Sequence, residues 1–404
     1  MVSRWAPYGA GRWIVVTILS LPLLWLSLAV SIAGVTDRHH PSQALMWWPW
    51  SADASANLAG RLVVGSSPTD RAEVTELAQR ALRRQAILPV AVRTLAIAKV
   101  YANPTSDKPR ELIAYAEKLS RRDAPTQLWL IEDSVQRGNV ASALIHYDRI
   151  LRTSLEARAQ VLPVLTAAVN DPAIARALAR LLARQPSWRD DFVSQMVTRV
   201  DNPVSLATLL PVAGLSAQSP QDRGYLQLGL TRIATQGSPD LAYRLYRRFG
   251  GQPPAPGQTV VNGDLSREPG LAPFDWIGND DPALATSREM SDEKWQFHAS
   301  VAAGATGNLA RQMLITLPGR YAISARVSGP ASDGSLVTLT LRCLDTKTLF
   351  SAPWRGGNGI AGTADVPAGC RATWLTFEGR GALDNGPSDY WLGPISVRRT
   401  TTGS

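Results

Sequence analysis

The hydrophobic positions divide the 404-residue chain into three regions with different periodicity. The first is a continuous apolar run, with no charged residue from Trp13 to Val35. The second, from about residue 54 to 250, has apolar residues at three- and four-residue spacing, which is the period of amphipathic helices. The third, from Thr259 onward, alternates apolar and polar residues in short runs typical of strands. The pattern predicts an apolar helix, a helical array and a β domain, in that order.

The apolar run is long enough to cross the hydrocarbon core of a membrane as a helix. We interpret residues 13–35 as a transmembrane helix, in which Pro22 is tolerable because membrane helices contain proline more often than soluble ones. A cleaved signal peptide is the other interpretation. It rests on Ser31-Ile32-Ala33, which has the small-x-small pattern of a cleavage site, although the run is longer than a usual signal core.

Charges on either side of the run predict its orientation. Arg4 and Arg12 lie in the short tail before it, residues 1–12, whereas Asp37 accompanies Arg38 after it. The positive-inside bias therefore predicts a cytoplasmic tail. The remaining residues then lie outside the cytoplasm, and we expect a single-pass protein of the bacterial inner membrane with its bulk in the periplasm.

Prolines preceded by Ser, Asn, Asp or Ala recur along residues 36–250 and divide this region into segments of helix length. Short helices joined by short turns favour antiparallel pairs. Two turns share the pattern Gly-x4-Ala-x3-Tyr. Its two copies are Gly138, Ala143 and Tyr147, and Gly237, Ala242 and Tyr246.

This shared pattern resembles the second-helix half of a tetratricopeptide repeat. In that repeat the glycine reverses the chain, the alanine lets two helices approach and the aromatic ring fills the groove toward the next unit. The resemblance implies a concave surface that binds a protein partner. Neither copy meets the full consensus, so an irregular α-solenoid is the alternative interpretation.

A proline- and glycine-rich run, residues 251–257, is interpreted as a linker between the helical array and the β domain. Beyond it, residues 258–400 contain short alternating runs such as Tyr321–Val327 and Leu336–Arg342, separated by turn-forming residues. About 145 residues of this kind predict an all-β antiparallel sandwich of jelly-roll type. The predicted protein is therefore multidomain: a membrane helix, an all-α repeat region and a β-sandwich.

The β domain opens with Val261-Asn-Gly-Asp-Leu265 and closes with Asp389-Tyr-Trp-Leu-Gly-Pro-Ile-Ser-Val397. These ends resemble jelly-roll carbohydrate-binding modules, which implies a polysaccharide ligand. With the apolar helix and the repeats in front, the whole chain is similar to membrane-anchored tetratricopeptide-repeat proteins of bacterial exopolysaccharide and envelope systems. The resemblance also implies a structural calcium ion with Asp264 and Asp389 as ligands, although both are equally ordinary turn and strand-end acids.

Sugar-binding sites combine flat aromatic faces with hydrogen-bonding side chains. The sequence around Trp354 has the composition of an exposed loop, so we predict that Trp354, Arg355 and Asn358 contact a glycan. The other candidate aromatic residues for sugar stacking are expected to lie mostly in the core. They are Trp276, Trp295, Trp374, Tyr390 and Trp391.

The two cysteines of the chain, Cys343 and Cys370, are both flanked by strand-like sequence. A disulfide between them suits an oxidising compartment, and two free buried thiols are the alternative. Neither has a His or Cys companion at zinc-ligand spacing. We expect no cofactor apart from the calcium ion that the resemblance implies.

The formal net charge of +9 belongs to the N-terminal part, since residues 258–404 contain 13 basic and 14 acidic residues. The basic residues are scattered, and no nucleic-acid motif accompanies them. We find no set of nucleophile, base and orienting residue either. The sequence therefore predicts a non-enzymatic scaffold. The alternative is an envelope enzyme acting on polysaccharide, a glycosidase or lyase, which would use acids such as Glu289 and Asp292.

Overall fold

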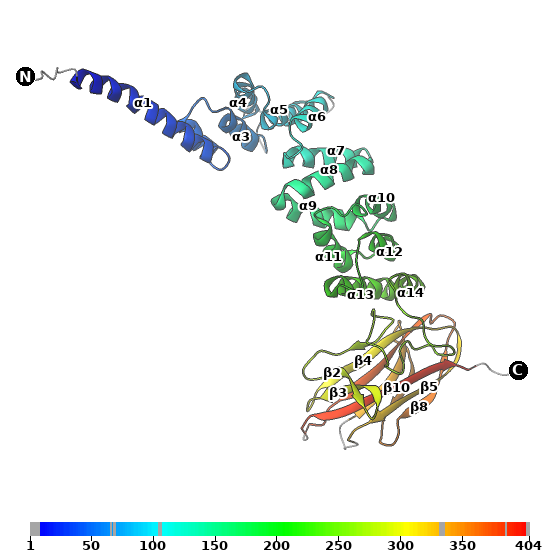
Figure 1. The fold of residues 1–404 in the computed structure, drawn as a ribbon. Coiled ribbons are helices and arrows are strands. Elements are labelled where there is room, and N and C mark those ends of the chain that lie inside the picture. The colour runs from blue at the N-terminus through cyan, green and yellow to red at the C-terminus, as the bar shows by residue number, and fades with distance from the viewer. Residues whose placement is uncertain are drawn as a thin grey trace, which may run out of the picture. The chain divides into compact units, whose positions relative to one another are not determined.

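The computed structural model describes residues 9–64, 67, 70–103, 107–330, 336–383 and 386–400, with side chains from residue 16 onward (Figure 1). The chain forms two compact units, residues 1–161 and 162–404. Most of the predicted cytoplasmic tail, including Arg4, lies outside the described residues.

The apolar run forms the helix α1, Gly9–Thr36, with Pro22 inside it. Within α1, the segment Val16–Thr36 is long and apolar enough to cross a membrane. Its side chains are largely exposed, and Leu24 has 70% of its surface accessible. The predicted apolar helix is therefore confirmed, and a signal sequence would meet the same criteria of length and composition.

Further short helices follow α1 in the first unit, and several begin with a proline or with a capping Asp or Asn. At the start of α7, for example, the Asp123 carboxylate accepts a hydrogen bond from the Thr126 backbone N–H at 3.1 Å. The helices are α2 (Pro41–Trp47), α3 (Ala52–Leu62), α4 (Asp70–Arg84), α5 (Pro89–Ala102), α6 (Lys108–Leu119), α7 (Ala124–Gln136), α8 (Val140–Thr153) and α9 (Leu155–Ala168), which runs into the second unit.

The second unit continues with helices of the same kind, several of them led by proline. They are α10 (Pro172–Leu182), α11 (Arg189–Arg199), α12 (Pro203–Leu209), the 3-10 turn η1 (Leu210–Val212), α13 (Pro220–Thr235) and α14 (Pro239–Arg248). The described part of the chain before the sandwich is thus a helical region with fourteen α-helices, as the periodicity predicts.

Both turns that carry the Gly-x4-Ala-x3-Tyr pattern join two packed helices, α7 with α8 and α13 with α14. Gly138 and Gly237 have positive φ angles of 67° and 86°, which glycine adopts without steric cost. The alanines and tyrosines of both copies are buried. The predicted helical hairpins are therefore confirmed at both positions.

The C-terminal part of the second unit is an antiparallel sandwich of two five-stranded sheets, which confirms the predicted architecture (Figure 1). Sheet A has the strand order β1-β4-β9-β6-β7, and sheet B has the order β2-β3-β10-β5-β8. The strands are β1 (Ile277–Gly278), β2 (Thr286–Ser291), β3 (Lys294–Val301), β4 (Thr306–Ile315), β5 (Gly319–Ser328), β6 (Leu336–Cys343), β7 (Thr348–Pro353), β8 (Ile360–Val366), β9 (Ala372–Arg380) and β10 (Ser388–Arg399).

The core lies between the two sheets because successive side chains of a strand point to opposite faces. In β5, Ile323, Ala325 and Val327 are buried in the core, whereas Ser324 and Arg326 between them are exposed. The outer face of sheet B is therefore a separate surface, on which alternate residues of each strand are presented to solvent.

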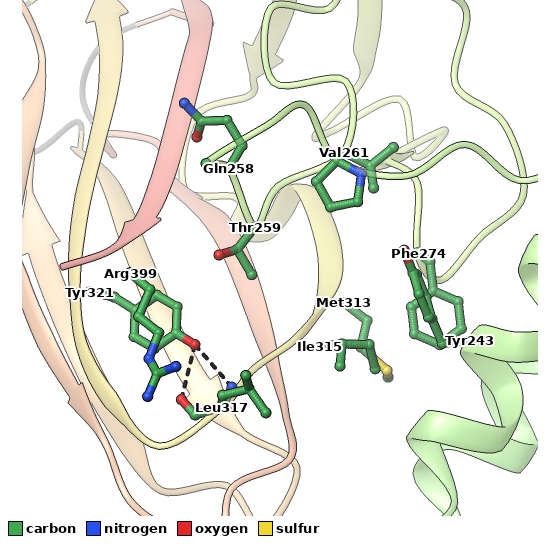
Figure 2. A pocket seen from close by; sticks show the side chains of 12 residues that line it. Tyr243, Gln258, Thr259, Val261, Phe274, Met313, Ile315, Leu317, Tyr321 and Arg399 are labelled. Atoms are coloured by element: carbon green, nitrogen blue, oxygen red, sulfur yellow. Dashed lines mark hydrogen bonds between the residues drawn. The ribbon is translucent and has the colours of Figure 1, made fainter. Parts of the chain in front are cut away.

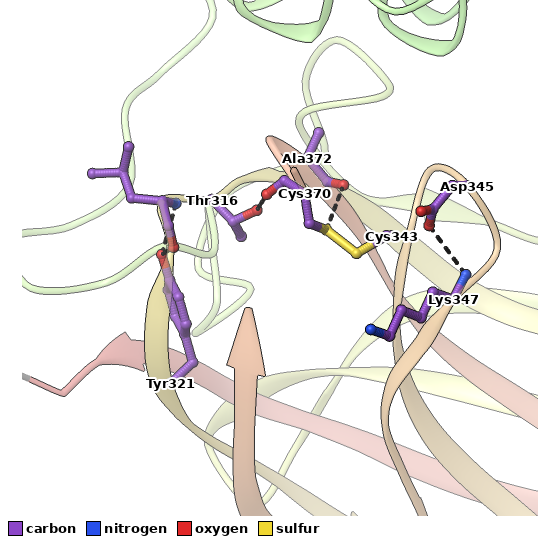
Figure 3. The surroundings of a disulfide bond; sticks show 8 residues. Thr316, Tyr321, Cys343, Asp345, Lys347, Cys370 and Ala372 are labelled. Atoms are coloured by element: carbon purple, nitrogen blue, oxygen red, sulfur yellow. Dashed lines mark hydrogen bonds between the residues drawn. A yellow bond between two sulfur atoms is a disulfide. The ribbon is translucent and has the colours of Figure 1, made fainter. Parts of the chain in front are cut away.

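A disulfide joins Cys343 and Cys370, whose Cα atoms lie 5.7 Å apart, and confirms the predicted bridge (Figure 3). Cys343 ends β6, whereas Cys370 lies in the turn before β9, which is the neighbour of β6 in sheet A. The flanking sequence predicts that the bridge links two strands, and this detail is wrong, because the bridge joins the end of β6 to the turn before β9. The Cys370 carbonyl also accepts a hydrogen bond from the Thr316 hydroxyl at 3.1 Å.

The α13–α14 hairpin packs directly on the sandwich. The ring of Phe274, in the segment before β1, lies 5.3 Å from the ring of Tyr243 and 5.4 Å from that of Tyr246, measured between centroids. An ion pair of 3.0 Å joins Asp240 of α14 to Arg371 of the sandwich. The last helical hairpin and the sandwich thus share an aromatic contact and a charge contact.

Candidate functional site

The structure places Trp354 in the core of the sandwich, so the prediction of an exposed ring is wrong. Only 6% of Trp354 is accessible, and its ring meets Tyr390 edge-on at 6.1 Å. The Trp354 backbone N–H donates to the Val337 carbonyl at 2.8 Å, which continues the pairing of β7 with β6 by one residue and turns the ring inward. Arg355 and Asn358 remain exposed on the following loop, separated from the buried ring.

The two acids predicted to bind calcium lie in different surroundings. The Asp264 carboxylate accepts hydrogen bonds from the Ser266 backbone N–H at 3.3 Å and from the Ser266 hydroxyl at 3.1 Å, which makes a local turn. Asp389 lies at the start of β10, with its carboxylate 3.4 Å from Nε2 of His298. Within the described ranges, no three His, Cys, Asp or Glu side chains gather in a way that could hold a metal ion.

Several other tryptophan rings of the sandwich are buried or covered by an arginine side chain. Trp276 is buried, with 2% of its surface accessible. The guanidinium of Arg288 lies 3.5 Å from the centroid of the Trp295 ring, and that of Arg311 lies 4.7 Å from the centroid of the Trp374 ring. These cation–π contacts cover ring faces that a sugar would otherwise stack on.

Trp391 points out of the sandwich from sheet B, and its ring stacks on His298 and not on an arginine. Its neighbours in β10, Tyr390 and Leu392, are fully buried, so alternation directs Trp391 to the outer face. The opposite residue in the β3–β10 ladder is His298, which lies between the buried Phe297 and Ala299 and also points outward. Both outward side chains are only partly buried.

Trp391 and His298 form a stacked pair on this surface, with ring centroids 4.7 Å apart and an interplanar angle of 32°. Two carboxylates flank the imidazole at 3.4 Å, Glu289 at Nδ1 and Asp389 at Nε2. On the other side of Trp391, the paired residue of β5 is Ser328, which is exposed.

We call this surface the Trp391 face. It comprises the outward side chains of Ser287, Glu289, His298, Ser300, Ser328, Asp389 and Trp391. It combines an aromatic platform with hydroxyl and carboxylate oxygens, the groups that stack on the apolar face of a sugar ring and bind its hydroxyls. Trp391 stands in the closing strand Asp389–Val397 that the sequence identifies, whereas the pairing with His298 depends on strand register.

A separate cavity of about 490 Å³ lies between α14 and the sandwich (Figure 2). Phe274, Met313 and Ile315 give it an apolar wall. Two of its polar side chains are bonded to backbone, and the Tyr321 hydroxyl meets the Leu317 N–H and carbonyl at 2.9 Å each. Arg399 likewise donates to the Pro318 carbonyl at 2.6 Å. The cavity is therefore mainly apolar on this wall, in contrast to the Trp391 face, which presents carboxylate and hydroxyl oxygens.

The sandwich resembles carbohydrate-binding modules of known structure. A structure described as TmCBM61 in complex with β-1,4-galactotriose is 11% identical, with 35% of this chain and 99% of that chain covered and a TM-score of 0.27. One described as CBM4 structure and function is 13% identical, with 35% and 99% covered and a TM-score of 0.28. The CBM22-1 xylan-binding domain from Paenibacillus barcinonensis Xyn10C is 13% identical, with 32% and 87% covered and a TM-score of 0.23. No protein-family profile and no curated protein matches the sequence.

Proposed function

We propose that the sandwich binds a glycan at the Trp391 face. The observation that carries the proposal is the outward Trp391 ring, stacked on His298 and flanked by the carboxylates of Glu289 and Asp389. A pyranose ring stacks its C–H face on an indole, and its hydroxyl groups donate to nearby carboxylates or exchange hydrogen bonds with serines. These partners surround Trp391 on β2, β3, β5 and β10.

We further propose that the rest of the chain is a non-enzymatic scaffold that carries this binding domain. The apolar helix α1 anchors the protein in the bacterial inner membrane, and the helical region binds a protein partner in the manner of tetratricopeptide repeats. The disulfide supports a location in an oxidising compartment such as the periplasm. A role in the synthesis or export of an envelope polysaccharide combines these parts. A reporter active only outside the cytoplasm is accordingly expected to work when fused after Ser404.

The glycan proposal is tested with the full chain in detergent on an array of bacterial polysaccharides. We expect Trp391→Ala to lose binding at least tenfold. The matched control is Trp374→Ala, which removes the same side chain from the outer face of sheet A, where Arg311 covers the ring. Equal affinity of Trp391→Ala and the parent protein, or the absence of any retained glycan, would overturn the proposal.

The second candidate function is an enzyme that cleaves envelope polysaccharide. The observation that favours it is the line of Glu289, His298 and Asp389, since acid–base chemistry on a sugar needs two positioned proton-transfer groups. Purified protein with sustained glycan turnover, abolished by Glu289→Gln or Asp389→Asn, would establish it. Binding without turnover would favour the scaffold. Asp292, the other acid expected to act in an enzyme, lies in the exposed β2–β3 turn.

A further inference from the structure

A second cavity, of about 550 Å³, adjoins the Trp391 face on the same side of sheet B. Its floor consists of outward side chains of β5 and β10, namely Ser324, Pro394, Ser396 and Arg398. The segment before β1 forms the opposite wall with Asn262, Asp264 and Arg267, among others. Pro394 follows Trp391 by three positions in β10, so the cavity begins where the Trp391 face ends.

Arginines without a carboxylate partner gather at this end of the sheet. Arg326 lies on β5 between Ser324, which lines the cavity, and Ser328, which is paired with Trp391. Arg326 and Arg398 are exposed and form no ion pair with a carboxylate of the described residues. By contrast, Arg320 on the same outer face of β5 is paired with Asp365 at 2.9 Å.

The carboxylates near this surface do not neutralise these arginines. Glu289 and Asp389 face His298 at the other end of the Trp391 face. Asp264 lines the cavity, but its carboxylate accepts two hydrogen bonds from Ser266 and forms no ion pair with an arginine of the described residues. The surface is therefore polarised along β10, with an aromatic and acidic end and a basic end.

We propose that the Trp391 face and this cavity form one groove that binds an anionic polysaccharide, a glycan whose sugars carry carboxylate or sulfate groups. The inference rests on the proposed glycan binding and specifies its ligand class. The guanidinium groups of Arg326 and Arg398 match such anions because their planar N–H groups donate in pairs. The stretch from Trp391 to Arg398 extends roughly 20 Å along the strand, which is room for several sugar rings.

The first test compares ligands that differ only in charge, using the full chain in detergent. Polygalacturonate carries carboxylates, and its fully methyl-esterified form has the same backbone without the charge. Dextran sulfate and dextran form the corresponding sulfate pair. We expect at least tenfold tighter binding of one charged member than of its neutral counterpart, with an affinity that falls as salt increases. The pair of ligands that shows this difference identifies the anionic group as a carboxylate or a sulfate.

The second test compares two double variants, each of which removes two positive charges, with the same pairs of charged and neutral ligands. Arg326→Gln with Arg398→Gln is expected to weaken the charged ligand at least tenfold. The control, Lys347→Gln with Arg380→Gln, removes two exposed positive charges from the sheet A side and is expected to bind as the parent does. Equal weakening in both double variants would show unspecific charge attraction and overturn the inference.

Failure of the ligand class is distinguishable from failure of glycan binding. If the neutral glycans bind as tightly as the charged ones and Trp391→Ala still loses binding, the anionic class is wrong and the glycan proposal stands. If Trp391→Ala leaves all binding unchanged, both are wrong. Unfolding curves of each variant establish that the fold is intact before binding is compared.

Discussion

His298 and Trp391 face each other across the β3–β10 ladder, with their ring centroids 4.7 Å apart. The stack fixes the orientation of the indole, while Glu289 and Asp389 hold the imidazole from both sides. A ring held in place loses less conformational freedom when a ligand binds to it. The pair is therefore the part of the surface whose geometry matters most for the proposed glycan binding.

Replacing His298 tests this relationship. We expect His298→Ala to lower glycan affinity about tenfold, because the Trp391 ring loses its support. Stability should change by less than about 0.5 kcal/mol, since the residue lies on a solvent-facing surface. His298→Phe keeps the stack without the carboxylate contacts and is expected to retain most of the affinity. Isothermal titration with the array-selected glycan measures both variants, and unchanged affinity in His298→Ala would contradict the assigned role.

The disulfide should stabilise the sandwich by roughly 3 to 4 kcal/mol on the loop-entropy model, given the 27-residue separation of Cys343 and Cys370. Replacing both by alanine is expected to lower the unfolding transition of the sandwich and to leave glycan affinity unchanged, because the bridge lies in sheet A. Differential scanning calorimetry checks this prediction. Parent protein treated with reductant serves as the control and should unfold like the variant.

Asp275 should make the second unit less stable as the pH rises through the acid range. Burial raises the pKa of this carboxyl, and hydrogen bonds from the Trp276 and Gly270 backbone N–H groups only partly offset the effect. The folded state therefore holds the proton more tightly than the unfolded state, whose carboxyl titrates near about 3.9. The contribution of Asp275 to stability is greatest below that value and declines as the pH rises through the folded pKa.

Asp275→Asn is accordingly expected to remove this decline and to match or exceed the parent in stability at pH 7. Urea unfolding between pH 3 and pH 7 measures it. Asp365→Asn is the control of opposite sign, because the hydrogen bond from Arg320 lowers the pKa of Asp365. Its contribution is present above the unfolded pKa and is lost as the pH falls. An unchanged pH slope in Asp275→Asn would refute the prediction.

The ion pair of Arg93 and Asp123 is a buried charge contact of the first unit. The two groups are 2.8 Å apart, and their side chains are 9% and 12% exposed. Asp123→Ala leaves the guanidinium buried without its partner and removes the cap of α7, so we expect a loss of about 3 to 5 kcal/mol. Asp123→Asn keeps the cap and should lose less. Circular dichroism during urea unfolding checks the order of the three proteins.

The β2–β3 turn consists of Asp292 and Glu293, which have positive φ angles of 50° and 58°. Asn and Gly are the residues favoured at two such consecutive positions of a hairpin turn. Asp292→Asn with Glu293→Gly should therefore stabilise the sandwich by about 1 kcal/mol. Glycan affinity is expected to stay unchanged. A lower unfolding midpoint in the variant would contradict the assignment of strain to this turn.

The large features of the fold could be predicted because each depends on local sequence. Composition marks α1, the turn-forming prolines divide the helical region, and alternation marks strands such as Tyr321–Val327. The disulfide was predictable because only two cysteines exist in the chain. The pairing of strands into two sheets was not specified, since it depends on contacts between residues far apart in sequence.

The candidate site was only partly predictable. The Trp354 segment reads as a loop, but one extra ladder bond to Val337 turns its ring into the core. Trp391 was recognisable as part of the closing strand, and alternation places its side chain on the opposite face of the strand from that of Tyr390. Whether Trp391 or Tyr390 points toward solvent follows only from the packing of the two sheets. The contact with His298, 93 positions earlier, follows from the register of β3 and β10.

The start of the proline-rich run folds back onto α14, the last helix. The Tyr246 hydroxyl donates to the Gln252 carbonyl at 2.9 Å, and the ring of Tyr246 leaves no room for a side chain at position 251. At the other end, the Thr259 N–H donates to the Val397 carbonyl of β10 at 2.7 Å. The run is therefore held by hydrogen bonds at both ends and forms a fixed connection between the last helix and the sandwich. The contact of Tyr246 with Phe274 and the hydrogen bonds at the two ends of the run therefore hold the last helix against the sandwich.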